Sequence, residues 1–244
     1  MTAKMHRAIK TALSPRRSAN NPVLLEFAAG DQVDGTSECN FAQQLFIDSL
    51  DLAHKALDTQ FIQGIKTGTL DPTVYGGYTV QDAAYVYNGA DLFVKLNKEA
   101  AEQGLCDLAN FAQHEAKSWG SFAQQMLKNW HISEPSAVAL NIAAKDYQKF
   151  KEDVFESSPP YYMIIALLPC NRLWAWLAKT LEPFATESNL YAFWITGNIS
   201  TNDHWDNFVN HHASKFDYKE ALEVFRKGME HEVDFFQSAF DANT

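Results

Sequence analysis

The segment from Tyr161 to Leu177 is the most apolar part of the chain and constrains the fold more than any other feature. We expect a buried helix here around which the other helices pack, and an apolar run of this length usually holds only space-filling side chains. Pro169, Cys170 and Arg172 nevertheless lie in its middle. A proline inside a helix bends the axis and can turn the next side chain toward a cavity. Cys170 is therefore a candidate reactive thiol, with a small buried core residue as the alternative.

The composition narrows the possible partners. The 244 residues are 46% hydrophobic, which is ample for a packed core, and the net charge of −10 argues against binding to nucleic acid or to an anionic membrane surface. A basic segment from Lys4 to Arg17 lacks the apolar core and cleavage pattern of a signal peptide and suggests a solvated N-terminal helix or arm. The apolar segment around Pro169 is interrupted before it reaches the roughly 18 residues that a membrane span needs. We expect a soluble protein without nucleic-acid or membrane partners.

The cysteines indicate the compartment. Cys39, Cys106 and Cys170 are odd in number, far apart, and form no CxxC pair. A secreted chain would more often carry an even set, so this usage favours a reducing compartment and a cytoplasmic protein.

Apolar residues recur at three- and four-residue steps through most of the chain, which is the helical period. The pattern predicts helices over 41–65, 73–97 with a possible break at Gly76-Gly77, 100–130, 136–155, 161–180, 189–196, 205–213 and 218–240. No segment shows strand alternation flanked by hairpin turns. We expect an N-terminal extension over 1–40 and one all-α domain of at least seven helices over 41–244.

Two further segments place polar groups on apolar helix faces. Asp82 and Tyr85 are three residues apart and share a face, where the carboxylate can accept hydrogen bonds from a ring nitrogen or an amine. Glu232 and Phe235 have the same spacing, and a carboxylate against an aromatic ring would have a raised pKa suited to acid and base work. A solvated aspartate and a surface acidic helix are the alternative interpretations.

Four motifs in order resemble those of the thiaminase II (TenA) family. They are Phe61-Ile62-Gln63-Gly64-Ile65-Lys66-Thr67-Gly68-Thr69-Leu70 with Tyr78-x-x-Gln81-Asp82-x-x-Tyr85, Ala166-Leu167-Leu168-Pro169-Cys170, Tyr191-x-x-Trp194-Ile195, and Glu232-x-x-Phe235-Phe236-x-x-Ala239. The resemblance spans about 41–240. It implies a heme-oxygenase-like, all-α multihelical bundle, which agrees with the helical pattern.

The resemblance also implies an activity and roles for residues. In that family a cysteine attacks the methylene that links a pyrimidine to its leaving group, a glutamate transfers protons, and an aspartate with tyrosines holds the aminopyrimidine. By position, Cys170 would be the nucleophile, Glu232 the acid and base, and Asp82 the anchor. The remaining substrate-binding positions would be Tyr78, Tyr85, Trp174, Tyr191 and Phe235. The expected substrate is thiamin, a thiamin-breakdown aminopyrimidine or a related aminomethyl heterocycle, with no metal or cofactor, in a homo-oligomer.

The chain departs from this pattern at three tyrosines. The family has one in the segment after its third helix, where residues 135–140 supply none, and one four residues after the cysteine, where Trp174 stands. A third falls at Asn198. These changes predict a reshaped pocket and leave open whether thiamin itself is the substrate.

Two other classes of function remain open. A metal-dependent oxygenase or oxidase on the same fold would need carboxylate and histidine ligands, and the candidates are Glu115 with His114, and Asp203, His204, Asp206, His211 and His212. Neither group makes a clean i, i+4 pair. Heme would need an axial histidine, for which His54 is the candidate. A non-catalytic relative that binds a small molecule is the third class.

Overall fold

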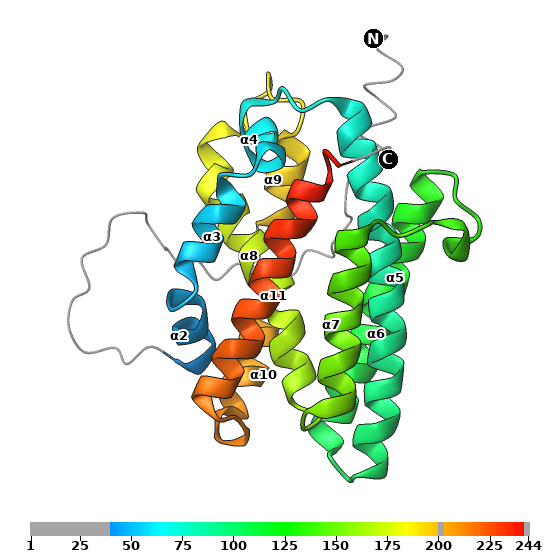
Figure 1. Ribbon diagram of the computed structural model, residues 1–244, viewed down its shortest axis with the longest axis vertical. Helices are drawn as coiled ribbons and strands as arrows, with labels where there is room; N and C mark the ends of the chain where they lie inside the picture. Colours follow the sequence, from blue (N-terminus) through cyan, green and yellow to red (C-terminus); the bar gives the residue numbers. More distant parts are fainter. Residues whose placement is uncertain (1–39, 200–202, 242–244) are drawn as a thin grey trace, which may run out of the picture.

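The structure, a computed structural model, describes residues 40–199 and 203–241, which are almost entirely helical (Figure 1). The α-helices are α2 (Phe41–Ile47), α3 (Leu50–Leu57), α4 (Gln60–Thr67), α5 (Pro72–Glu102), α6 (Cys106–Asn129), α7 (Ile142–Ser157), α8 (Tyr162–Leu181), α9 (Ala192–Asn198), α10 (His204–His211) and α11 (Tyr218–Ser238). Three short 3-10 helices, η1 (Pro135–Ala137), η2 (Glu182–Phe184) and η3 (Ala213–Lys215), lie between them. These residues contain no strand, which confirms the all-α prediction. The predicted extension over 1–40 lies outside them except for Asn40, so its boundary stays a prediction.

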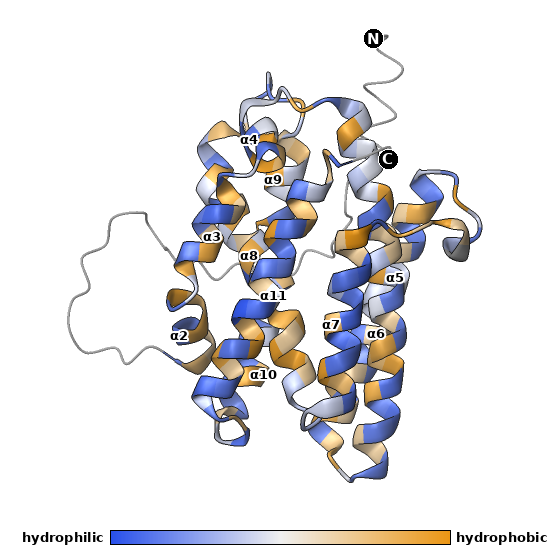
Figure 2. Cartoon of the chain, viewed as in Figure 1, coloured by the Kyte–Doolittle hydropathy of each residue, from blue (hydrophilic) through white to orange (hydrophobic). Residues whose placement is uncertain are grey.

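The long helices run alongside one another. α5 and α6 form a closely packed pair, α7 lies against α5 and α8, and α11 packs on α8 between α3 and α7 (Figure 1). Figure 2 shows hydrophilic residues on the visible outer faces of α6, α7 and α11. The amphipathic helices thus turn their apolar faces toward a shared interior.

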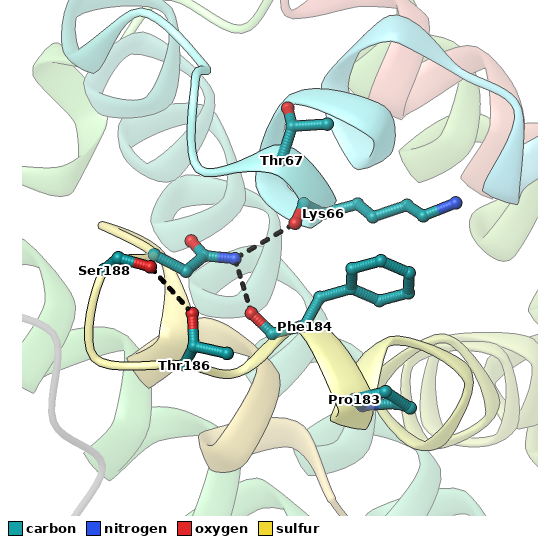
Figure 3. A pocket seen from close by; sticks show the side chains of 7 residues that line it. Lys66, Thr67, Pro183, Phe184, Thr186 and Ser188 are labelled. Carbon is teal, nitrogen blue, oxygen red and sulfur yellow. Dashed lines mark hydrogen bonds between the residues drawn. The ribbon is translucent and has the colours of Figure 1, made fainter.

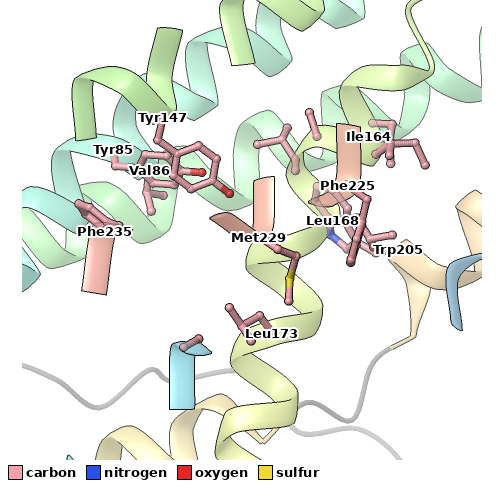
Figure 4. Packing of buried hydrophobic residues seen from close by; sticks show 14 of the residues in the cluster. Tyr85, Val86, Tyr147, Ile164, Leu168, Leu173, Trp205, Phe225, Met229 and Phe235 are labelled. Atoms are coloured by element: carbon pink, nitrogen blue, oxygen red, sulfur yellow. The ribbon is translucent and has the colours of Figure 1, made fainter. Parts of the chain in front are cut away.

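Helix α8 is the most deeply buried element, as its sequence predicts. Its residues 162–169 are all buried, and 162–168 belong to the core cluster. Leu168 and Leu173 lie near Phe225 and Met229 of α11 in the packed interior (Figure 4). Gly228 permits a close approach of α11, because a Cβ there would stand 2.7 Å from Pro169 Cγ. The proline that precedes Cys170 is therefore packed directly against α11.

Several helix boundaries differ from the sequence-based expectation. The helices expected to begin at residues 100 and 136 begin at Cys106 and Ile142, and two predictions about continuity are wrong. The helix expected over 41–65 is three helices, with α3 ending before Asp58 and the Thr59 hydroxyl capping α4. The helical spacing of apolar residues continues across these breaks because each of the three helices buries apolar residues at three- and four-residue steps. The break expected at Gly76-Gly77 is absent, and α5 runs unbroken. A Cβ at Gly76 would lie 2.8 Å from the Trp130 ring, so this glycine makes room for a neighbouring side chain.

Within the described residues, no helix combines the length and apolarity that crossing a bilayer requires.

Candidate functional site

One face of α5 supplies three of the predicted site residues. Tyr78, Asp82 and Tyr85 stand at i, i+4 and i+7 and therefore project from the same side of the helix. All three are buried. The side chain of Asp71 caps the start of α5 and Pro72 occupies its first turn, which fixes where this face begins.

Asp82 is a buried carboxyl group that the protein leaves unsatisfied. It is 8% exposed, and within the described part of the chain its carboxyl oxygens have no hydrogen-bond partner. Burial, helped by the nearby Glu232 carboxylate and opposed by Lys151, raises the pKa of Asp82 to about 8. At neutral pH Asp82 is therefore mostly a neutral acid that can both donate and accept a hydrogen bond.

Glu232 on α11 is the centre of a hydrogen-bond network. It is 2% exposed; the Tyr147 hydroxyl donates to Oε1 at 2.9 Å, and Trp174 Nε1 donates to Oε2 at 2.9 Å. Burial raises the pKa of Glu232, while these two donors and the Cys170 thiol lower it in part. The carboxyl group is thus held in one orientation and remains able to exchange a proton.

Cys170 on α8 lies beside Glu232. The thiol forms a hydrogen bond with the Glu232 carboxyl group, and the side chain is partly exposed. A thiol beside a carboxylate that can take its proton is the arrangement of an activated nucleophile.

Aromatic rings surround these polar groups. The Phe235 ring lies 4.9 Å from Tyr78 and 5.8 Å from Tyr85, measured between centroids, and Tyr85 lies 4.7 Å from Tyr147. Figure 4 shows Tyr85, Tyr147 and Phe235 on the same side of the packed interior. The hydroxyl of Tyr78 is buried and has no hydrogen-bond partner among the described residues.

Tyr191 is the predicted site residue that lies apart. Its hydroxyl donates to the Leu70 carbonyl at 2.7 Å, and its ring packs 5.0 Å from Tyr75. Its ring also lies 6.1 Å from that of Phe193. Tyr191 therefore anchors the chain at Leu70.

Sequence reasoning missed two residues on α7. Residues 135–140 supply no tyrosine, but Tyr147 of the next helix donates its hydroxyl to Glu232 Oε1. One turn later Lys151 is fully buried, with its Nζ 3.5 Å from the centre of the Tyr85 ring. The signal lay in the spacing of Ala144, Tyr147, Lys151 and Val154, which puts the lysine on the buried face of a helix that reads as polar.

The candidate metal ligands fall into separate places. His114 and Glu115 of α6 meet His204 of α10, with ligand atoms within 4.8 Å of one another. His204 Nε2 lies 2.7 Å from the buried Glu115 carboxylate, which therefore has a partner without an ion. Asp206 instead pairs with Arg172 of α8. His54 is exposed beside the Trp176 ring, at 5.5 Å, and does not point into the core.

Two surface hollows lie away from these groups. Figure 3 shows one between α4 and η2, where the Asn189 amide donates to the carbonyls of Lys66 and Phe184 at 3.1 and 2.9 Å. The other lies beside His204 and is lined by Asp107, Asn110, Phe111, Asn207, Phe208, His211 and His212. Neither includes Cys170, Asp82 or Glu232.

Similarity to known proteins is found in structure and not in sequence. No family model and no curated protein matches the chain. A TenA homologue from P. horikoshii OT3 has a TM-score of 0.69 at 18% identity, covering 84% of this chain and 100% of that one. A TenA homologue from Pyrococcus furiosus gives 0.67 at 18%, covering 82% and 99%. A putative TenA-like thiaminase from Sulfolobus solfataricus P2 gives 0.63 at 16%, covering 82% and 95%. The chain therefore has the all-α, heme-oxygenase-like fold of the TenA homologues, as its motifs predict.

Proposed function

We propose that the protein is a TenA-like hydrolase that acts on an aminopyrimidine, or on a related aminomethyl heterocycle, through Cys170 and Glu232. One observation carries the proposal. The thiol and the carboxyl group meet beside Asp82, a buried acid that has no hydrogen-bond partner among the described residues. The nearby Tyr78 hydroxyl is also buried without a partner among the described residues; such a group costs about 1–3 kcal/mol, and a bound ligand would recover this cost.

The chemistry of Asp82 suits an aminopyrimidine. A neutral carboxylic acid donates one hydrogen bond through its O–H and accepts another at its carbonyl oxygen. A ring nitrogen next to an exocyclic amine offers the matching acceptor and donor. The rings of Tyr78 and Phe235 supply aromatic surfaces on which a flat heterocycle can stack.

The proposed reaction has two displacements at the methylene carbon. The Cys170 thiolate attacks this carbon, an S–C bond forms, and the C–N bond to the leaving group breaks. Glu232 gives the leaving nitrogen a proton. Water then attacks the same carbon, the S–C bond breaks, Glu232 takes the proton from the water, and an alcohol product leaves.

A turnover experiment tests the proposal. The folded protein is incubated with 4-amino-5-aminomethyl-2-methylpyrimidine and, separately, with thiamin, and products are followed by mass spectrometry. We expect cleavage of at least one compound, its loss in Cys170→Ser, and its retention in Cys106→Ser, because Cys106 is exposed on α6. Absence of turnover with both compounds in correctly folded protein would overturn the hydrolase proposal.

A second candidate function rests on the group formed by His114, Glu115 and His204. Two histidines and one carboxylate are a ligand set used by non-heme iron oxygenases. A metal-dependent oxygenase or oxidase would require this group to bind iron. Iron analysis of the parent protein and of Glu115→Gln after loading with Fe(II) tests it, and equal iron content in the two proteins would exclude a site there.

A further inference from the structure

Lys151 is a buried cation that the proposed reaction does not use. Its side chain is fully buried, and its Nζ has no hydrogen-bond partner among the described residues. The ammonium lies 3.5 Å from the centre of the Tyr85 ring and 5.5 Å from that of Tyr147, so aromatic faces are its close contacts. Two cation–π contacts only partly replace the hydration that a buried ammonium loses.

The position of Lys151 ties it to the site. It follows Tyr147 by one turn on the same face of α7, and the Tyr147 hydroxyl binds Glu232, which in turn binds the Cys170 thiol. The titratable groups that act on the ammonium come from four helices: Asp82 and Tyr85 of α5, Tyr147 and Glu152 of α7, Cys170 of α8 and Glu232 of α11. Cys170 and Glu232 are among the groups that favour the charged form of Lys151 and raise its pKa.

We infer that Lys151 stabilises the thiolate of Cys170 and is thereby a positioning residue for the nucleophile. The inference rests on the proposed function because that function makes Cys170 the nucleophile. A nearby cation would favour the thiolate, since a charged Glu232 carboxylate would oppose its formation. Lys151 lowers the pKa of both Asp82 and Glu232, so its positive charge acts on both carboxyl groups beside Cys170.

The electrostatic state of the lysine fits this role. Burial lowers the pKa of Lys151 to about 7, while the charges of Cys170 and Glu232 raise it in part. The protonation states of the Lys151 amine, the Cys170 thiol and the Glu232 carboxyl group therefore depend on one another. Ionisation of the thiol favours protonation of the amine. A thiolate and an ammonium in a water-poor site stabilise each other more strongly than they would at the surface.

The reactivity of the thiol tests the inference without any substrate. In a Cys39→Ser, Cys106→Ser background, the rate of carbamidomethylation of Cys170 by iodoacetamide is measured from pH 5.5 to 10. We expect Lys151→Met to slow the reaction about 10-fold at pH 7, which corresponds to a rise of about one unit in the thiol pKa. Lys151→Arg and the matched control Lys149→Met, an exposed lysine of the same helix paired with Asp153, should keep the parent profile.

A pH profile of Lys151→Met that matches the parent would overturn the inference, whether or not the protein hydrolyses an aminopyrimidine. A second measurement does not depend on a Lys151 variant. With 13C-labelled lysine, NMR follows the titration of Lys151 in the parent and in Cys170→Ser. We expect a lower lysine pKa in Cys170→Ser, because the thiolate that favours the ammonium is gone, and an unchanged value would contradict the role.

Discussion

Trp174 Nε1 donates a hydrogen bond to Glu232 Oε2 across 2.9 Å, at the position where the family pattern has a tyrosine. The Trp174 indole N–H thus supplies a hydrogen-bond donor at the position where the family's tyrosine hydroxyl is missing from this chain. With the Tyr147 hydroxyl on Oε1, both oxygens of the buried carboxyl group are held. Trp174 therefore supplies a hydrogen-bond donor to the proposed acid and base.

Replacing Trp174 by Phe should destabilise the protein by about 1–3 kcal/mol, because a buried carboxyl oxygen loses its donor. The same loss should raise the pKa of Glu232 further, and the acidic limb of the activity profile should move to higher pH. Urea unfolding and a pH–rate profile measure the two effects. Trp176→Phe is the control, since its indole contacts Phe46 and His54 and not Glu232. Equal pH profiles for the two variants would contradict the assignment.

Replacing Asp82 by Asn should stabilise the protein, and by an amount that grows with pH. The folded pKa of Asp82, about 8, lies above its ordinary value of 3.8, so between these pH values the folded state holds a proton that the unfolded state releases. This group's contribution to stability is therefore present in acid and is lost as pH rises through the window. Relative to the parent, Asp82→Asn should gain more free energy of unfolding at pH 8 than at pH 4.5.

The exposed Asp91 of the same helix gives the control for that measurement. Asp91→Asn should change the free energy of unfolding by no more than about 0.5 kcal/mol at either pH. If the stability difference for Asp82→Asn does not vary with pH, the carboxyl group is not a buried neutral acid.

Gly228→Ala should destabilise the protein by about 1–3 kcal/mol, because the new Cβ would stand 2.7 Å from Pro169 Cγ and 3.1 Å from the Ala166 carbonyl in a packed core. It should also lower turnover, since Pro169 adjoins Cys170. Gly77→Ala is the matched substitution: its Cβ meets nothing within 4 Å, and it should stabilise α5 by about 0.4–1 kcal/mol. Thermal unfolding of both variants measures the contrast, and equal shifts would contradict the described packing.

The sequence predicted the features that depend on local spacing. The apolar run around Pro169 identified α8, and the three-residue steps from Asp82 and from Glu232 identified two faces that meet in the structure. The division of the first predicted helix was missed because apolar periodicity continues across Asp58 and Thr59 and hides the cap. The continuity of α5 was missed because Gly76 makes room for the Trp130 ring and does not end the helix. Local sequence does not reveal this contact.

The site itself was only partly predictable. Motifs located Cys170 and Glu232, but Tyr147 and Lys151 lie on a helix whose composition is polar, and their role depends on what α7 packs against. The contact between Glu115 and His204 likewise joins residues that are 89 positions apart in the sequence, on two different helices. Contacts between distant segments follow from the tertiary arrangement and leave no periodic signal in either segment alone.

The most direct test of the account is covalent trapping on Cys170. The protein is mixed with 4-amino-5-aminomethyl-2-methylpyrimidine, quenched in acid within a single turnover, digested and analysed by mass spectrometry. We predict a pyrimidinylmethyl adduct on the peptide that contains Cys170, appearing before the alcohol product, decaying as product forms, and formed far more slowly in Glu232→Gln. Product formation with no adduct on Cys170, or an adduct that forms equally fast in Glu232→Gln, would contradict the claim that the thiol and the carboxyl group act together.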